Sequence, residues 1–243
     1  RQGPLVCASS QAVNDWFDRH VDAINEPNRP IPSGRIPGRW GLYLGIIWSL
    51  LSLIVSAFLG VWGFCATLVA LLFSWAYSMP PIRLKQNGWY GNFACSISYE
   101  GLAWITGAAL LSKTLTPSNP SLIFAALYSV GAHGIMTLND FKAIEGDKKM
   151  GVRSLPVQLG AERAAKVACW IMIVPQLFVV GYLLMVDRSS YALVLTALII
   201  AQLFLMRYFL RQPIERALFY SGFGVPLFVS GMMVAACLLY TSD

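Results

Sequence analysis

Charged residues are scarce in this chain. They make up 12% of its 243 residues, about half the fraction found in an ordinary soluble domain, whereas hydrophobic residues make up 56%. This composition excludes an ordinary soluble domain and indicates a membrane protein. The formal net charge of +6 requires no nucleic-acid partner, because a chain with several membrane spans gathers basic residues in its cytoplasmic loops.

Two further features are missing, paired cysteines and a recognisable start. The five cysteines (Cys7, Cys65, Cys95, Cys169 and Cys237) lie singly in apolar segments, with no CxxC pair and no zinc spacing. We interpret them as small packing residues. No signal peptide is visible, since residue 1 is not Met and the first residues already follow an apolar pattern. We therefore expect an N-terminally truncated chain.

Long apolar runs are abundant. One helical crossing of a hydrocarbon core of about 30 Å needs roughly 20 apolar residues. Runs of this length occupy 41–60, 61–79, 90–112, 121–141, 167–186, 190–210 and 217–240. The segment before Asn14 is similar to the end of another span. The sequence thus predicts an all-α, polytopic membrane helix bundle.

Basic residues fall into alternate gaps between these spans. Counting the gap after the leading segment as the first, 15 of the 18 lie in odd-numbered gaps. They are Arg19, Arg29, Arg35, Arg39, Arg83, Lys85, Lys142, Lys148, Lys149, Arg153, Arg163, Lys166, Arg207, Arg211 and Arg216. The other gaps contain only Lys113 and Arg188, and Arg1 stands at the start. The positive-inside rule therefore places the odd-numbered gaps in the cytoplasm.

An acidic stripe follows the leading segment. It consists of Asn14, Asp15, Asp18 and Asp22. The spacings of three and four residues put these side chains along one side of a helix that continues from the apolar segment. Like charges at this spacing destabilise a helix, and a hard divalent cation such as Mg²⁺ would compensate them. The alternative is a solvated helix end whose acids pair with Arg19 and Arg29.

A second acidic cluster follows the span at 121–141. In "TLNDFKAIEGDKKMGVRSLP" the polar residues are Asn139, Asp140, Glu145 and Asp147, interleaved with Lys142, Lys148, Lys149 and Arg153. Both clusters lie on the same predicted face of the membrane. Mg²⁺ binds through a few carboxylates plus substrate phosphates, and arginine and lysine bind the remaining phosphate oxygens. The joint pattern predicts a diphosphate held between the two clusters.

The third gap, "YSMPPIRLKQNGW", belongs to the same predicted side. It offers Tyr77, Arg83 and Lys85 near a Pro-Pro turn. Arg83 and Lys85 could contact the ligand or only anchor the topology, and the sequence leaves both open. An amphiphilic diphosphate fits this location, because its head can lie at the interface while its hydrocarbon tail lies among the spans.

At these residues the chain resembles the UbiA superfamily of intramembrane prenyltransferases. The first motif of that family, N-D-x-x-D-x-x-x-D, is matched in full from Asn14 to Asp22, and "RPIPSGR" is also similar. The second motif departs from D-x-x-x-D. Aligned through "GVRS", Asp147 takes the last aspartate while Ala143 stands where the first is expected. Asp140 and Glu145 are the nearest substitutes.

The stretches "NDWFDRHVDAINEPNRPIPSGRIPGRWGLY" and "LNDFKAIEGDKKMGVRSLPVQLG" resemble the chlorophyll and bacteriochlorophyll synthase branch. "SYEGLAWITGAA" and "GAHGIMTLND" are more similar to the bacteriochlorophyll side of it. The resemblance implies a nine-helix fold of which about eight helices are present, in one intramembrane domain over 1–243. It also implies a bacterial inner, photosynthetic membrane, with the acidic motifs on the cytoplasmic side and potential association with other pigment-synthesis or photosystem-assembly proteins.

The reaction implied by the resemblance joins the propionate of a bacteriochlorophyllide to geranylgeranyl or phytyl diphosphate and releases pyrophosphate, with Mg²⁺ as cofactor. A solvated carboxylate is already ionised at neutral pH, so we assign no general base. The implied metal ligands are Asp15, Asp18, Asp22, Asp140, Glu145 and Asp147, of which Asp15, Asp18, Asp140 and Asp147 carry catalysis. The implied substrate contacts are Asn14, Arg29, Tyr77, Arg83, Lys85, Glu100, His133, Asn139, Lys142 and Arg153.

Two ionisable residues lie inside predicted spans. His133 precedes Asp140 by two helical turns, so both could face one cavity. His133 could ligate the tetrapyrrole magnesium, but we favour a hydrogen-bonded packing histidine. Placing the ionisable Glu100 within a span costs free energy, so its side chain is expected to face a cavity or a partner. Its position implies a role in specificity rather than catalysis.

The sequence leaves three rival functions open. A transporter would line an ion path with its acids, although transporters place polar groups at mid-membrane depth, whereas these acids cluster at one face. A non-catalytic assembly subunit would not need two clusters of metal ligands. Among enzymes, the alternative is a related prenyltransferase that acts on a quinone or haem precursor.

Overall fold

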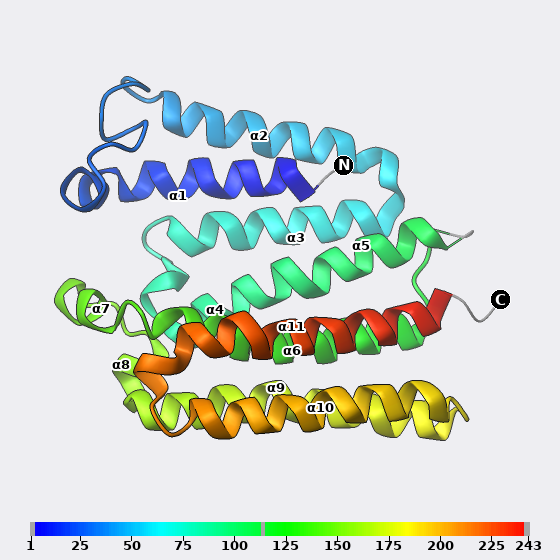
Figure 1. Ribbon diagram of the computed structural model, residues 1–243. Helices are drawn as coiled ribbons and strands as arrows, with labels where there is room; N and C mark the ends of the chain where they lie inside the picture. Colours follow the sequence, from blue (N-terminus) through cyan, green and yellow to red (C-terminus); the bar gives the residue numbers. More distant parts are fainter. Residues whose placement is uncertain (1–2, 113–114, 241–243) are drawn as a thin grey trace. The chain divides into compact units, whose positions relative to one another are not determined.

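The computed structural model describes residues 3–112 and 115–240 (Figure 1). Within these residues the structure is helical, and the bridge between Asn87 and Arg153 is the one β-type pairing. The predicted all-α membrane bundle is confirmed. Arg1 and Lys113, which entered the charge sorting, lie outside the described residues.

Each predicted span coincides with helical structure. The α-helices are α1 (Gly3–Asn25), α2 (Trp40–Ser56), α3 (Gly60–Ser78), α4 (Gly88–Ser96), α5 (Leu102–Leu111), α6 (Asn119–Asp140), α7 (Ile144–Met150), α8 (Leu155–Leu159), α9 (Ala161–Met185), α10 (Ser189–Phe209) and α11 (Pro213–Tyr240). The short helical turns are η1 (Ala57–Leu59) and η2 (Leu84–Gln86), while η3 (Ile97–Gly101) is a π-helical turn that joins α4 to α5.

Five helical stretches of the described residues are long and apolar enough to cross a membrane. They are Trp40–Ser78, Asn119–Asp140, Ala161–Met185, Ser189–Phe209 and Pro213–Leu239, and the first of them contains both α2 and α3. Two predicted segments fall outside this set for physical reasons. Helix α1 carries the acidic stripe, and the π turn divides 88–111 into shorter pieces.

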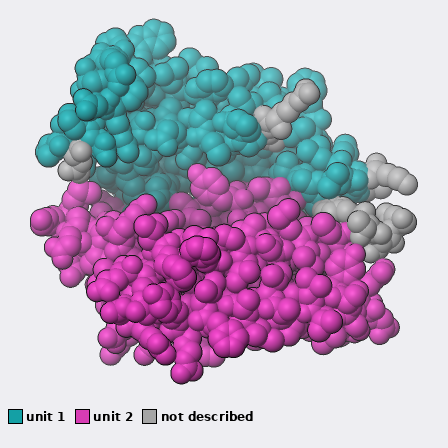
Figure 2. All heavy atoms as spheres, in the orientation of Figure 1, with its two compact units in different colours: residues 1–85, 105–117 teal, residues 86–104, 118–243 magenta. Residues whose placement is uncertain are grey.

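The chain divides into two compact units (Figure 2), which we describe separately. Unit 1 comprises residues 1–85 and 105–117, and unit 2 comprises residues 86–104 and 118–243.

Unit 1 is built on α1, which packs against α2 and α3 (Figure 1). Small residues allow a close approach, as is usual between membrane helices. A Cβ at Gly45 would lie 2.9 Å from Val13 Cγ2, and the hydroxyls of Ser9 and Ser49 are 2.7 Å apart. Asn14 of α1 donates to Ser78 Oγ at the end of α3, across 3.0 Å. The acidic end of α1 is thereby fixed beside the loop that follows α3.

Unit 2 contains the larger core, in which α6 packs along α9 and α10 packs along α11. Buried side chains from these four helices fill it, among them Phe124, Met172, Leu195 and Phe228. The segment that follows α6 returns to the start of α4. Arg153 accepts a hydrogen bond from Gly88 N and donates one to Gln86 O, each across 2.8 Å. The second acidic cluster therefore lies against the N-terminal end of α4.

Candidate active site

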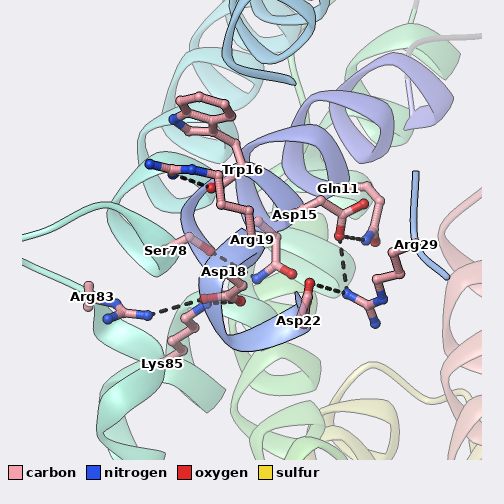
Figure 3. A network of polar contacts seen from close by, with 11 residues as sticks. Gln11, Asp15, Trp16, Asp18, Arg19, Asp22, Arg29, Ser78, Arg83 and Lys85 are labelled. Atoms are coloured by element: carbon pink, nitrogen blue, oxygen red, sulfur yellow. Dashed lines mark hydrogen bonds and ion pairs between the residues drawn. The ribbon is translucent and has the colours of Figure 1, made fainter. Parts of the chain in front are cut away.

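The acidic stripe lies on one unbroken helix, as predicted. Asp15 and Asp22 are two turns apart on α1, and both face Arg29 from the following loop (Figure 3). Nη1 of Arg29 lies 3.3 Å from Asp15 Oδ1 and 3.0 Å from Asp22 Oδ2. Two carboxylates thus converge on a single cationic nitrogen. Asp22 is buried, at 8% exposure, and Asp15 is half-buried.

Asp18 faces a different pair of cations (Figure 3). Arg83 Nη2 lies 3.1 Å from its Oδ1, and the Lys85 ammonium forms an ion pair with its Oδ2. Burial lowers the pKa of Lys85, and the neighbouring Asp18 opposes that shift. Both side chains thus end on the central aspartate of the acidic motif, and their contact with the ligand stays a prediction.

The backbone around Arg83 is strained. Its φ of 37° lies in the left-handed region, which costs a non-glycine residue of order 1–3 kcal/mol and is often found at functional sites. The ion pair with Asp18 holds the side chain in place. Tyr77 is half-buried near the end of α3 and directly precedes Ser78, the partner of Asn14.

Arg19 and Arg29, which would both pair with the acids of a solvated helix end, make different contacts. Arg29 pairs with the acids, whereas Arg19 donates to the carbonyl of Trp16 across 2.7 Å and lies 4.0 Å over the Trp16 ring. Compensation of the stripe therefore comes from loop residues that follow α1 and α3, and Arg19 contributes none of it.

The donor set of the first motif suits a hard cation. Among residues 3–112 and 115–240, no group of three His, Cys, Asp or Glu side chains is already gathered for a metal ion. Arginine and lysine nitrogens occupy the positions between the carboxylates instead. Mg²⁺ needs only one or two carboxylates together with substrate phosphates. The convergence of Asp15 and Asp22 on one cationic atom meets that requirement.

In unit 2, Asp140 ends α6 and is held on two sides. Asn92 Nδ2 donates to its Oδ2 across 3.1 Å, and the backbone N–H of Leu155 also hydrogen bonds to this carboxyl. Asn92 donates as well to Thr137 Oγ1, at 3.3 Å. Asn92 was missed by sequence reasoning. Its signal was a lone amide within an apolar run, which does not say which residue it contacts.

Asp147 and Glu145 differ in their surroundings although both lie on α7. Asp147 is half-buried and close enough to Asp140 for the two charges to repel each other. Glu145 is exposed and makes no hydrogen bond or ion pair with the residues that the structure describes. The structure thus brings Asp140 and Asp147 together and leaves Glu145 apart. Asn139, Lys142 and Arg153 also have exposed side chains.

A glycine allows this arrangement. A Cβ at Gly88 would lie 2.5 Å from Leu155 N and 2.9 Å from the Ser154 carbonyl carbon, closer than any side chain can approach a backbone. Since only glycine fits, the start of α4 can lie directly on the segment before α8. This contact brings Asn92 within reach of Asp140.

Residues 3–223 match the UbiA prenyltransferase family. The chain belongs to this family. It is 57% identical over 234 residues to the bacteriochlorophyll synthase 33 kDa chain of Cereibacter sphaeroides, covering 96% of this chain and 77% of that protein.

Solved UbiA-type structures share the fold. A digeranylgeranylglyceryl phosphate synthase superposes with a TM-score of 0.77 at 24% identity, over 98% of this chain and 82% of that one. A UbiA homologue from Archaeoglobus fulgidus, bound to GPP and Mg²⁺, superposes with a TM-score of 0.70 at 20% identity, over 97% of this chain and 88% of that one.

His133 of this UbiA family member is 8% exposed. Its Nε2 lies 3.2 Å from the carbonyl oxygen of Trp89, and the centroids of the His133 and Trp89 rings are 5.6 Å apart. Its Nδ1 is buried and makes no hydrogen bond to the described residues. This geometry agrees with a packing histidine, since neither nitrogen is open to a macrocycle.

Glu100 lies in η3, the π turn between α4 and α5. Its carboxyl makes no hydrogen bond or ion pair with any residue that the structure describes. Single π turns within helices are frequent at functional sites, and Glu100 stays a candidate for specificity. The prediction that both acidic clusters hold one diphosphate also stays a prediction.

Proposed function

We infer that this UbiA-family chain is a bacteriochlorophyll synthase. It esterifies the propionate carboxyl of a bacteriochlorophyllide with an isoprenoid diphosphate, geranylgeranyl or phytyl, and releases pyrophosphate. The observation that carries this conclusion is the similarity to the Cereibacter sphaeroides protein along nearly the whole chain. The complete aspartate motif on α1 supports the same reaction class.

The first motif is proposed to receive the diphosphate head. When bound, Mg²⁺ neutralises phosphate charge and helps the leaving group depart. Asp15, Asp18 and Asp22 would hold it, in keeping with the Mg²⁺ and GPP in the Archaeoglobus fulgidus homologue. Before substrate arrives, Arg29, Arg83 and Lys85 keep these carboxylates compensated.

The same cations are suited to a second partner. Arginine and lysine bind phosphate oxygens through charge-assisted hydrogen bonds. When the carboxylates turn to metal, Arg29, Arg83 and Lys85 can turn to the diphosphate and stabilise the charge that develops as the allylic C–O bond breaks. All three side chains already lie at the motif.

In the second motif, we propose that Asp140 takes the place of the missing first aspartate and acts with Asp147. This proposal is supported by the hydrogen bonds that Asn92 and Leu155 make to Asp140 and by the proximity of Asp147. The exposed Glu145 has no such restraint. A carboxylate fixed by neighbours binds metal at less entropic cost than a mobile one.

The acceptor needs no base from the protein. Its propionate is ionised at neutral pH, so the protein must orient it and exclude water from the allylic cation. The protein is an integral membrane protein with several apolar helices, which supply a water-poor environment. We propose that it resides in the photosynthetic inner membrane of a bacterium, with both acidic motifs facing the cytoplasm.

One experiment tests the assignment. Membranes that contain the full-length protein are incubated with bacteriochlorophyllide, geranylgeranyl diphosphate and Mg²⁺, and pigments are separated by chromatography. An esterified pigment that depends on all three is expected. Parallel reactions with a quinone precursor and with haem test the related prenyltransferases, and a product with one of those alone would overturn the assignment.

A further inference from the structure

A groove in unit 2 is lined by residues of α9, of α10 and of the turn after α10. The two helices are neighbours in the structure (Figure 1). Its volume is about 720 Å³. Buried side chains of Cys169, Ile173 and Met206 form its floor. Trp170 and Phe204 form its walls and are 67% and 72% exposed. The groove is thus apolar over most of its length and open to the surroundings of the protein.

Three cations line one end of this groove. Lys166 lies in the second turn of α9, Arg207 lies in the last turn of α10, and Arg211 follows in the next loop. None of the three makes an ion pair or a side-chain hydrogen bond with the described residues. Glu162 and Glu215 each stand four residues from one of them yet form no such pair. The groove therefore has a concentrated positive end without a protein counterion.

The dimensions fit a lipid. At 1.5 Å per residue, the helical run from Lys166 to Ile173 and that from Arg207 to Ile200 each extend about 10 Å. Half of a hydrocarbon core measures about 15 Å. A lipid whose phosphate meets the cations can therefore lay one acyl chain along the apolar floor, within a single leaflet. Both helices are long and apolar enough to cross a membrane, so an open groove on their surface is within reach of lipid.

We propose that this groove binds an anionic phospholipid, with the phosphate held by Lys166, Arg207 and Arg211 and an acyl chain lying against Trp170 and Phe204. Charge complementarity selects the occupant, since basic pockets between membrane helices bind anionic head groups. A zwitterionic lipid would bring its own cation to a site that already has three. The site shares no residue with either acidic motif and does not depend on the proposed reaction.

The test uses native mass spectrometry of the full-length protein in detergent, titrated with phosphatidylglycerol or phosphatidylcholine. The double variant Arg207→Gln/Arg211→Gln is compared with Arg163→Gln/Arg188→Gln, which removes one arginine of α9 and the arginine directly before α10, both outside the groove. The wild type is expected to prefer phosphatidylglycerol, and the groove variant to lose about tenfold in affinity for it. Arg207→Lys/Arg211→Lys retains the charge and should retain most of the preference.

Several outcomes would overturn the proposal. These are equal binding of the two lipids by the wild type, equal losses in groove and control variants, and displacement of the lipid by geranylgeranyl diphosphate, which would make the groove a substrate site. A dimer that disappears in the groove variant would assign the groove to a second copy of the chain. If the double variant does not fold, Lys166→Gln on the other helix provides the same comparison.

Discussion

The amide of Asn92 on α4 donates a hydrogen bond to Asp140 at the end of α6, across 3.1 Å. The two residues are 48 positions apart in the chain, and the contact depends on the close approach at Gly88. This amide donor holds the Asp140 carboxylate in one direction. The bond therefore turns an irregular second motif into an ordered one.

Replacement of Asn92 should weaken the response to Mg²⁺. Asn92→Leu keeps the side-chain size but removes the donor to Asp140, and loss of a partner that orients a metal ligand typically costs 10- to 100-fold in metal affinity or activity. Activity is measured across a Mg²⁺ titration. Thr137→Val is the control, because it removes the other contact of Asn92 and a hydrogen bond to the His133 carbonyl but leaves the bond to Asp140 in place. An unchanged Mg²⁺ requirement in Asn92→Leu would show that Asp140 does not depend on this bond.

The central aspartate of the first motif should be essential. Asp18→Asn keeps the shape of the side chain but removes a negative ligand and leaves Arg83 and Lys85 unpaired. Activity should fall by at least about 100-fold, as for loss of a group that acts on transition-state charge, while insertion and folding are retained. Asp187→Asn, in the exposed turn before α10, is the control. Near-normal turnover of Asp18→Asn at limiting Mg²⁺ would mean that the stripe is not the metal site.

The two acids of α7 should respond differently to substitution. Asp147 lies beside Asp140, whereas Glu145 is exposed. Asp147→Asn is therefore expected to reduce the turnover rate by about 10- to 100-fold, and Glu145→Gln by less than about threefold. Initial rates at saturating Mg²⁺ are compared. Mild and equal effects would show that this segment is only a charged loop and that Asp147 is not a metal ligand.

Sequence reasoning succeeded where the cause is local. Apolar run lengths predicted the helices, and the three- and four-residue spacings predicted that α1 continues through the acidic stripe. It did not predict the ion pairs of Arg83 and Lys85 with Asp18, because these join residues more than 60 positions apart. Asn92 escaped notice for the same reason. The π turn at Glu100 also carries no sequence signal. It differs from an α-helix only in that its backbone hydrogen bonds join residues five apart instead of four.

Activity should depend on the protonation of Lys85. Burial lowers the pKa of this ammonium below its ordinary value of 10.5, so it loses its charge at a lower pH than an exposed lysine does. As pH rises through that pKa, Lys85 can no longer compensate Asp18 or contact a phosphate, and activity should fall. The propionate acceptor stays ionised throughout this range.

Lys85→Arg separates this effect from other alkaline losses. Arginine remains charged above pH 12, so the variant should keep its activity at alkaline pH values where the wild type declines. Rates of both are measured from neutral pH upward, with stability followed in parallel. A decline at the same pH in both proteins would assign the titration to another group.

The last prediction concerns topology, and it rests on the charge sorting. The loops that contain Arg29, Lys149 and Arg211 should be cytoplasmic, while Arg188 should lie on the opposite side. Moving an ionised group to the middle of a span costs about 2.5–3.5 kcal/mol, so these basic loops cannot readily enter the bilayer. The proposed reaction requires the same arrangement, because a water-soluble diphosphate head that meets both acidic motifs must reach them from one compartment.

Single cysteines at Asn28, Lys149 and Asn119 test this arrangement, since all three side chains are exposed. They are placed in a background whose native cysteines are replaced, and intact cells are treated with a thiol reagent that cannot cross the membrane. Asn119 begins α6, at the opposite end from Asp140, and should be the only position labelled. Permeabilised cells should label all three, which controls for reactivity. Labelling at Asn28 but not at Lys149 in intact cells would put the two acidic motifs on opposite faces, where one diphosphate could not meet both.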